Sequence, residues 1–186
     1  MGLLDGMPTS LADVQRSSMA TAGLLARLFE RHPDLPPRFE AACKAMVEGQ
    51  TPAMVIGLDR KEIDALLALG GKYLQVGQIE QAKEWLSLVC TLDPLEQRAL
   101  YLLGVACQTS GEYGLAAQMY IRFLALDATN PEGYLRLGEC FLANAEPDQA
   151  RGCFEMAGHL CGKGHGTDKA REHAERMLAA LPAQSK

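Results

Sequence analysis

The chain has 186 residues, 48% of them hydrophobic, and a formal net charge of −5. This length can bury a core, and this composition is typical of a globular chain rather than a disordered one. Lys and Arg form no basic stripe, which argues against a nucleic-acid partner because phosphate binding needs clustered cations.

The sequence shows no targeting or membrane segment. Residues 1–10 lack the positively charged start and the apolar run of a signal peptide. No window approaches the ~18 apolar residues that a membrane-spanning helix needs. We therefore expect a cytoplasmic protein with no stable membrane insertion.

The first sixty residues do not share the pattern of the rest of the chain. Residues 10–32 predict a helix with Ser10 as its N-cap and a modest apolar seam, and the segment HPDLPP at residues 32–37 ends it. A second helix is expected over about residues 38–48. An apolar seam outside a repeat stack must be covered, and a second copy of the chain is the simplest cover. Residues 1–60 are therefore expected to form an N-terminal helical region that mediates dimerisation.

From Ile63 onward the chain repeats itself with a step of 34 residues. If Ile63 is position 1, a Leu-Gly pair stands at positions 7 and 8 of three successive units. Small residues recur at positions 15 and 20 and large apolar residues at position 24: Gly77, Gly111 and Ala145; Ala82, Ala116 and Ala150; Leu86, Tyr120 and Phe154. This pattern resembles the tetratricopeptide (TPR) repeat, a helix-turn-helix unit. The units are residues 63–96, 97–130 and 131–164, in a repeat region of residues 61–164.

The recurring residues have physical roles in such a helix pair. Small residues at positions 8 and 20 let the two helices cross closely, and large apolar residues fill the space between them. Gly at position 15 tolerates the positive φ of a turn and ends the first helix. Pro94 at position 32 is expected to stop a second helix, whereas Ala128 and Gly162 at the same position should give less sharply defined ends.

The C-terminal region, residues 165–186, follows the repeats. Residues 167–181 predict an amphipathic helix with Ala170, Ala174, Met177, Leu178 and Leu181 on one face. The last unit of a repeat stack has an open face, and this helix is expected to cap it. The predicted fold class is all-α: three tandem TPR helix-turn-helix repeats forming a concave superhelix, with N-terminal helices and a C-terminal capping helix.

Candidate catalytic and metal-binding residues are weak in this sequence. The six cysteines form no CxxC pair, and we interpret them as reduced, buried thiols. The most metal-like cluster has a spacing that fits no zinc pattern: Cys153, His159, Cys161, His165 and His173. We expect no metal, no cofactor and no enzyme activity.

The groove of the predicted superhelix is the candidate binding site. In TPR helix pairs, positions 2, 5, 9, 12 and 13 of the first helix face the groove, and position 2 here carries Asp64, Arg98 and Glu132. The candidate residues for binding a peptide are mostly apolar: Leu67, Gly71, Leu74, Tyr101, Val105, Gln108, Leu135 and Glu139. Such a groove suits an extended segment with apolar or proline anchors, and Tyr101 is the central hot-spot candidate. The alternative for the other apolar positions is that they pack against their neighbours.

One known mode of TPR recognition is not expected here. TPR domains that hold the C-terminal tail of heat-shock chaperones use a clamp of Lys, Asn and Arg around a carboxylate. The matching positions carry Leu67, Gly71, Leu102, Glu132 and Arg136. Only the last of them fits that clamp.

Two stretches extend the resemblance beyond generic TPR repeats. They are MVEGQTPAMVIGL at residues 46–58 and CTLDPLEQRALYLLGVACQTSGEYGLAAQMY at residues 90–120. With them, residues 42–181 resemble the class II chaperones of bacterial type III secretion, which guard translocator proteins. The N-terminus is some twenty residues longer than is usual in that family and includes an additional helix.

This resemblance implies a function. Such chaperones keep hydrophobic, pore-forming translocators unaggregated in the bacterial cytoplasm, and their groove takes a short Pro- and Leu-containing motif near the translocator's N-terminus. Mapped by position, the eight groove residues above would form the pockets. Family members often form homodimers through the segment before the repeats, here about residues 38–58.

Two other interpretations are left open by the sequence. The first is a structural TPR scaffold that joins folded partners in an assembly. The second is a needle-subunit chaperone of the same secretion systems, although those proteins are smaller and lack the N-terminal region.

Overall fold

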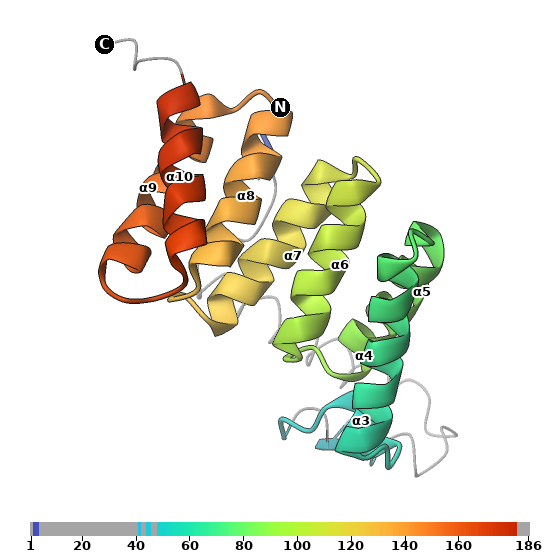
Figure 1. The fold of residues 1–186 in the computed structure, drawn as a ribbon. Helices are drawn as coiled ribbons and strands as arrows, with labels where there is room; N and C mark the ends of the chain where they lie inside the picture. Colours follow the sequence, from blue (N-terminus) through green and yellow to red (C-terminus); the bar gives the residue numbers. More distant parts are fainter. Residues whose placement is uncertain (1, 4–40, 42–43, 46–47, 182–186) are drawn as a thin grey trace. The chain divides into compact units, whose positions relative to one another are not determined.

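A computed structural model describes residues 2–3, 41, 44–45 and 48–181 of the chain (Figure 1). The helix expected over residues 10–32 and most of the one expected over residues 38–48 lie outside the described residues. The chain divides into two compact units, one of residues 64–186 with residues 1–5 and one of residues 6–63. No helix among the described residues is both long enough and apolar enough to cross a membrane.

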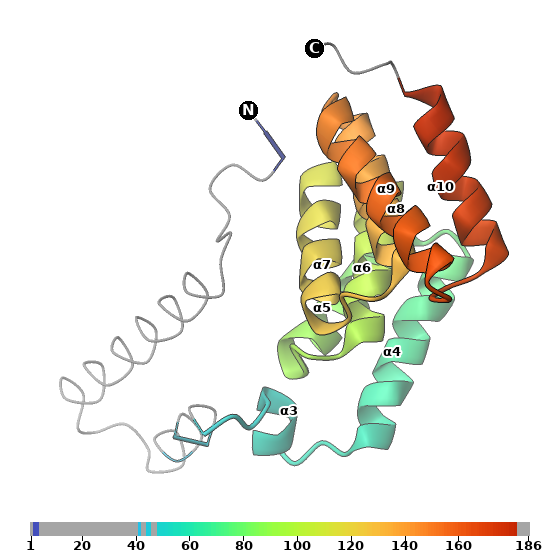
Figure 2. The ribbon, with the colours of Figure 1, turned by 90° about the vertical axis from the view of Figure 1, so that its left-hand side faces the viewer.

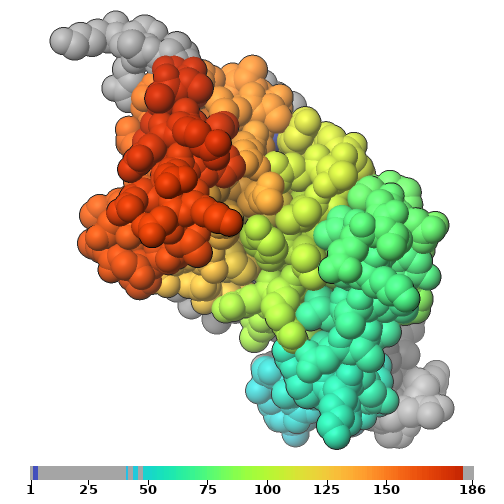
Figure 3. All heavy atoms as spheres, in the orientation of Figure 1, coloured from blue at the N-terminus to red at the C-terminus, as the bar shows by residue number. Residues whose placement is uncertain are grey.

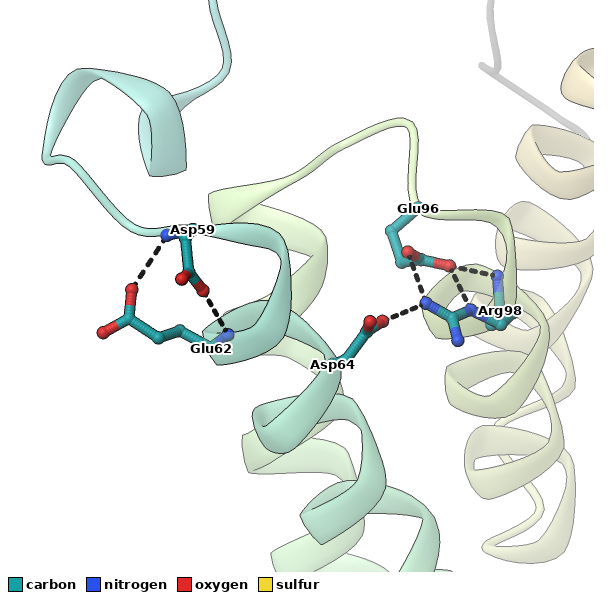
Figure 4. A network of polar contacts seen from close by, with 5 residues as sticks. All are labelled: Asp59, Glu62, Asp64, Glu96 and Arg98. Carbon is teal, nitrogen blue, oxygen red and sulfur yellow. Dashed lines mark hydrogen bonds and ion pairs between the residues drawn. The ribbon is translucent and has the colours of Figure 1, made fainter.

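The described part of the second unit consists of short local structures. Helix α3 (Pro52–Val55) begins where the Thr51 hydroxyl accepts a hydrogen bond from the amide of Met54 at 3.3 Å. The start of α4 (Arg60–Gln75) is held by a reciprocal cap (Figure 4). The amide of Glu62 donates to Asp59 Oδ1 at 2.9 Å, and the amide of Asp59 donates to Glu62 Oε2 at 2.8 Å. This capping box satisfies two amides that a helix start leaves without partners.

The three predicted helix pairs are confirmed, and no strand occurs among the described residues. The first pair is α4 with α5 (Ile79–Leu92), and the second is α6 (Gln97–Thr109) with α7 (Tyr113–Leu126). The third is α8 (Pro131–Ala143) with α9 (Pro147–Gly162). In Figure 2, α5 and α7 lie on one side of the unit that contains the repeats, and α4 and α10 lie on the other. The fold is all-α and is built from TPR repeats.

Each pair is closed by one glycine packed against a large side chain. A Cβ atom built on Gly104 would lie only 2.6 Å from Cε1 of Tyr120. The same contact recurs at 2.8 Å between Gly70 and Leu86, and at 2.7 Å between Gly138 and Phe154. The three large partners have no exposed surface. Position 8 is therefore glycine because the residue at position 24 occupies the space of its missing side chain.

The turn inside each repeat uses the same backbone bonds three times. The amide of Gly111 donates to the carbonyl of Gln108 at 3.1 Å, and the next amide, of Glu112, reaches back to the carbonyl of Cys107 at 2.8 Å. This is the Schellman pattern that ends a helix at a residue with positive φ. Gly111 has φ 80°, and Ala145 takes the same left-handed conformation at φ 60°. Ala145 is the only residue other than glycine with a positive φ in the described part of the chain.

The ends of the second helices differ from the expectation in one case. Helix α5 ends at Leu92, just before Asp93 and Pro94, as predicted. Helix α7 ends at the equivalent residue, Leu126, although no proline follows, and the amide of Asp127 closes its last turn on the carbonyl of Phe123 at 3.0 Å. Only α9, which runs to Gly162, continues beyond that point.

The predicted capping helix is present as α10 (Asp168–Ala180). The Thr167 hydroxyl caps its start by accepting from the amide of Ala170 at 3.2 Å. Ala170 and Ala174 are buried, and α10 packs on α9 and α8 (Figure 1). Its apolar face covers the last repeat.

Candidate binding groove

A pocket of about 560 Å³ opens on the side of the repeats where α4, α6 and α8 lie. Figure 3 shows that face with all heavy atoms drawn as spheres. Its lining comes from four helices and one interhelical turn: Leu67, Gln97, Arg98, Tyr101, Leu102, Phe123, Asn130 and Glu132. The first helices of all three repeats therefore contribute to one pocket. Its walls are mainly apolar, with polar and charged groups at one end of the first helices.

The eight predicted groove residues fall into different environments. Leu67 and Tyr101 line the pocket. Gly71 lies against α6, since a Cβ built on it would be 3.8 Å from Cδ1 of Leu102. Leu135, at the repeat position of Leu67 and Tyr101, is only 1% exposed. Leu74 and Val105 are half-buried, and neither lines the pocket.

Four pocket residues stand outside positions 2, 5, 9, 12 and 13 of the first helix, from which the groove candidates come. They are Gln97, Leu102, Phe123 and Asn130. The sequence does distinguish Phe123, because position 27 holds an aromatic ring only in this repeat and Val89 and Ala157 in the other two. Arg98 and Glu132 also line the pocket; they stand at position 2, which TPR geometry directs toward the groove, and are additional to the eight candidate residues.

Tyr101 is the best-supported residue of the pocket. Its ring centroid lies 5.4 Å from that of Phe123 and 5.9 Å from that of Tyr120, both in tilted arrangements. Such aromatic pairs stabilise one another beyond the area that they bury. Nε of Arg136, in the next repeat, lies 3.5 Å from the Tyr101 hydroxyl. The ring therefore stands half-exposed in the pocket while its neighbours hold it in one position.

Arg98 is held in place by two carboxylates (Figure 4). Glu96, only 4% exposed, accepts from the main-chain amide and Nε of Arg98 through Oε1, and from Nη2 through Oε2. Nη2 also donates to Oδ1 of Asp64, one full repeat earlier in the chain. These hydrogen bonds, first to Glu96 and then to Asp64, raise the pKa of the Arg98 guanidinium further. The charge of Arg98 is therefore permanent and its orientation is fixed.

Gln108 and Glu139 belong to a polar network that reaches the Tyr101 hydroxyl through Arg136. The Tyr120 hydroxyl donates to Gln108 Oε1 at 2.8 Å, and Gln108 Nε2 donates to Glu139 Oε2 at 2.8 Å. Burial raises the pKa of Tyr120, which keeps this hydroxyl protonated as a donor. Glu139 also accepts from Arg136 Nη1 at 3.2 Å, and its other oxygen lies 3.3 Å from His173 Nε2 on α10. This network joins α6, α7, α8 and α10.

The cysteine and histidine residues of the metal-like cluster do not form a metal site in the described part of the chain. No group of three or more His, Cys, Asp or Glu side chains that could hold a metal occurs among the described residues. The five described cysteines are free thiols, and Cys90, Cys107 and Cys140 are buried. Burial raises the pKa of Cys90 to about 11 and that of Cys140 to about 12, so neither is a thiolate near neutral pH.

Comparisons with known proteins agree with this architecture. A family model described as tetratricopeptide repeat matches residues 97–130. Among curated proteins, the type IV pilus assembly protein PilF of Pseudomonas aeruginosa is 32% identical over 132 residues, covering 62% of this chain and 52% of PilF. The BBSome complex member BBS4 of Bos taurus is 29% identical over 97 residues, covering 52% of this chain and 19% of BBS4. The chain thus spans about half or less of the length of the curated relatives it matches.

Solved structures match over more of their length. The type III secretion translocator chaperone SycD of Yersinia enterocolitica superposes with a TM-score of 0.67 at 26% identity, over 72% of this chain and 99% of SycD. PcrH of Pseudomonas aeruginosa, solved with the chaperone binding region of PopD, gives a TM-score of 0.64 at 28% identity, over 67% of this chain and 93% of PcrH. PcrH has also been solved with the chaperone binding region of PopB. The chain therefore contains a tetratricopeptide repeat at residues 97–130 and shares the fold of the type III secretion translocator chaperone SycD and of PcrH.

Proposed function

We propose that this protein is a chaperone of type III secretion that binds an extended segment of hydrophobic translocator proteins and keeps them soluble and competent for secretion. Its place of action would be the bacterial cytoplasm, and its role would be binding rather than catalysis. The observation that carries this proposal is the apolar pocket around Tyr101, in a fold shared with SycD and PcrH. The complexes of PcrH with binding regions of PopD and PopB support a translocator segment as the ligand.

The shape and lining of the pocket favour an extended segment. Aromatic-lined grooves dock proline-containing extended peptides well, because such peptides are preordered and lose little entropy on binding. Tyr101 and Phe123 provide aromatic surface, and Leu67 and Leu102 provide aliphatic surface beside it. A segment of the pattern Pro-x-Leu-x-x-Pro would place its leucine among these side chains.

The test is a binding titration with peptides of defined pattern. Ten-residue peptides of the form Pro-x-Leu-x-x-Pro, varied at x, are screened on an array, and the best binder is titrated by fluorescence anisotropy. We expect micromolar affinity for the wild-type protein. Tyr101→Glu should weaken binding at least about tenfold, because a charge replaces a central aromatic anchor. Absence of binding by the wild-type chain would contradict the proposal.

Tyr113→Glu is the matched control for this titration. Tyr113 is 36% exposed at the start of α7 and does not line the pocket. The same substitution there should leave the affinity unchanged. Equal losses in the two variants would mean that added negative charge, not loss of the pocket ring, had reduced the binding.

A scaffold function is the second candidate, and the curated relatives are the observation in its favour. PilF is a pilus assembly protein and BBS4 is a member of a complex. A scaffold would bind a folded domain, whereas a translocator chaperone would bind an isolated extended segment. Retention of affinity after the bound partner is reduced to its ten-residue segment would favour the chaperone.

We also propose that residues 1–60 form a dimerisation region, with residues 38–58 at the contact. The support is the family resemblance of residues 46–58 and the apolar seam of residues 10–32. Light scattering of the full chain, compared with a chain lacking residues 1–60, measures this directly. A full-length chain that is monomeric at high concentration would contradict it.

A further inference from the structure

Arg98 carries hydrogen-bond donors that the repeats themselves do not use. Its Nε binds Glu96, and its Nη2 binds both Glu96 and Asp64. Within the described part of the chain, Nη1 has no partner, and in Figure 4 one terminal nitrogen of Arg98 carries no dashed line. The side chain is 53% exposed and lines the pocket. Two N–H groups are therefore held in a fixed orientation at the place where a ligand would bind.

The charge around Arg98 defines what those donors can accept. One guanidinium faces the carboxylates of Asp64 and Glu96, and a further carboxylate, Glu132, lines the same pocket. Asp64 and Glu96 already bind this guanidinium, and Glu132 adds a carboxylate to the pocket lining, so an anionic ligand group meets repulsion there. A neutral acceptor meets no such repulsion. The main-chain carbonyl is the neutral acceptor that every extended peptide offers.

The position of Arg98 links this donor to the apolar anchor. Arg98 and Tyr101 stand three residues apart on α6, which places them on the same face of the helix, with Cβ atoms about 5–6 Å apart. Both line the pocket. An extended segment rises about 3.3 Å per residue, so a side chain and a main-chain carbonyl one or two residues away can contact both.

We propose that Nη1 of Arg98 donates a hydrogen bond to a main-chain carbonyl of the bound segment, next to the apolar side chain that contacts Tyr101. This assignment rests on the proposed function and deepens it. Tyr101 selects an apolar side chain, and Arg98 sets which residue of the segment lies there. The carboxylates of Asp64 and Glu96 are positioning residues, because they hold the guanidinium without touching the segment.

The test combines backbone substitution in the peptide with side-chain substitution in the protein. In the best Pro-x-Leu-x-x-Pro binder, each amide near the leucine is replaced in turn by an ester, whose carbonyl is a weaker acceptor. Each peptide is titrated into the wild-type chain and into Arg98→Met. We expect Arg98→Met to weaken the parent peptide about tenfold or more, the size of a hydrogen bond to a charged group. One ester should weaken binding to the wild-type chain and have no further effect in Arg98→Met.

Two further variants keep the result interpretable. Lys83→Met removes an ion-paired cation outside this pocket and should bind the parent peptide as the wild-type chain does. Arg98→Met leaves the buried Glu96 without its cation, which can unfold a domain. If circular dichroism shows that it has unfolded, Arg98→Lys takes its place, because it keeps the charge but lacks Nη1.

Each outcome separates this inference from the proposed function. Binding of the parent peptide with equal affinity by wild type and Arg98→Met would overturn the role of Arg98 alone. An equal effect of every ester in both proteins would also overturn that role. A peptide with Asp beside the leucine that binds more tightly through Arg98 would show that the donors take a carboxylate, against the inference. Failure of every array peptide to bind the wild-type chain would overturn the proposed function together with the inference.

Discussion

At the scale of single residues, the repeats depend on a close contact between glycine and a large side chain. Tyr120 has no exposed surface and lies where a side chain on Gly104 would be. Its ring is also near Tyr101, and its hydroxyl donates to Gln108. Packing inside the second repeat and the surface of the groove therefore depend on the same ring.

Gly104→Ala tests this contact. The new Cβ would meet three ring carbons of Tyr120 within 2.9 Å, and a buried ring has little room to move. We expect a loss of about 1–3 kcal/mol in the free energy of unfolding, measured by urea denaturation. Gly114→Ala is the control, because a Cβ atom added to Gly114 in helix α7 would meet no other part of the described protein within 4 Å, and alanine favours the helix there. A stable Gly104→Ala protein would show that Tyr120 can shift at low cost.

At the scale of the elements, charged side chains join consecutive repeats. Lys83 on α5 donates to Glu112 just before α7, and it also lies 2.8 Å from Glu80. The hydrogen bond that Glu112 accepts from Lys83, and then the one that it accepts from Ser110, lower the pKa of Glu112 below its usual 4.5. The pKa of Lys83 is raised, first by Glu112 and then by Glu80. These groups connect the first repeat to the second.

Lys83→Met should therefore change how stability depends on pH. A carboxylate whose folded pKa is depressed stabilises the fold above its unfolded pKa, and this stability is lost as the pH falls through the folded value. In the wild-type chain, Glu112 should contribute a loss of stability as the pH falls below about 4.5. In Lys83→Met the thermal midpoint should be lower at pH 7 than in the wild-type chain. It should also fall less steeply as the pH drops below about 4.5. Parallel curves for the two proteins would contradict this assignment.

At the scale of the whole stack of repeats, stability comes mainly from contacts between neighbouring helices. In stacked repeats each element touches mainly the next one, so damage at one end should remain local. Helix α10 covers the last pair through buried Ala170 and Ala174, and a Cβ on Gly158 of α9 would lie 4.0 Å from that of Ala174. His173 of the same helix reaches Glu139 in the polar network. The cap is thus connected to the groove side of the third repeat.

Ala174→Glu is expected to detach this cap. It places a charge without a partner at a position with no exposed surface, which should cost about 2 kcal/mol or more. Hydrogen exchange should then become faster in α8, α9 and α10, while α4 and α5 keep their protection. Ala179→Glu, at an exposed position of the same helix, should change neither. Uniform loss of protection along the chain would contradict nearest-neighbour stability.

The sequence alone was sufficient to predict the repeats and the cap. Contacts such as Gly104 with Tyr120 recur inside every helix pair, so they impose the same residue types at a constant step, and a period of that kind is visible without coordinates. Thr167 and the apolar face after it are likewise local, because a helix start and an amphipathic pattern depend on neighbours in the chain.

Only the tertiary structure decided which groove positions form a pocket. Tyr101 and Leu135 share one repeat position, yet Tyr101 is half-exposed in the pocket and Leu135 is 1% exposed. Arg98 is oriented by Asp64 from the preceding repeat, and Tyr101 lies beside Phe123 of the helix that follows it. The step of 34 residues states which residues are equivalent, but not which ones meet across neighbouring helices. Exposure and side-chain pairing depend on those crossings, because a side chain is buried by whatever packs against it rather than by its place in a repeat.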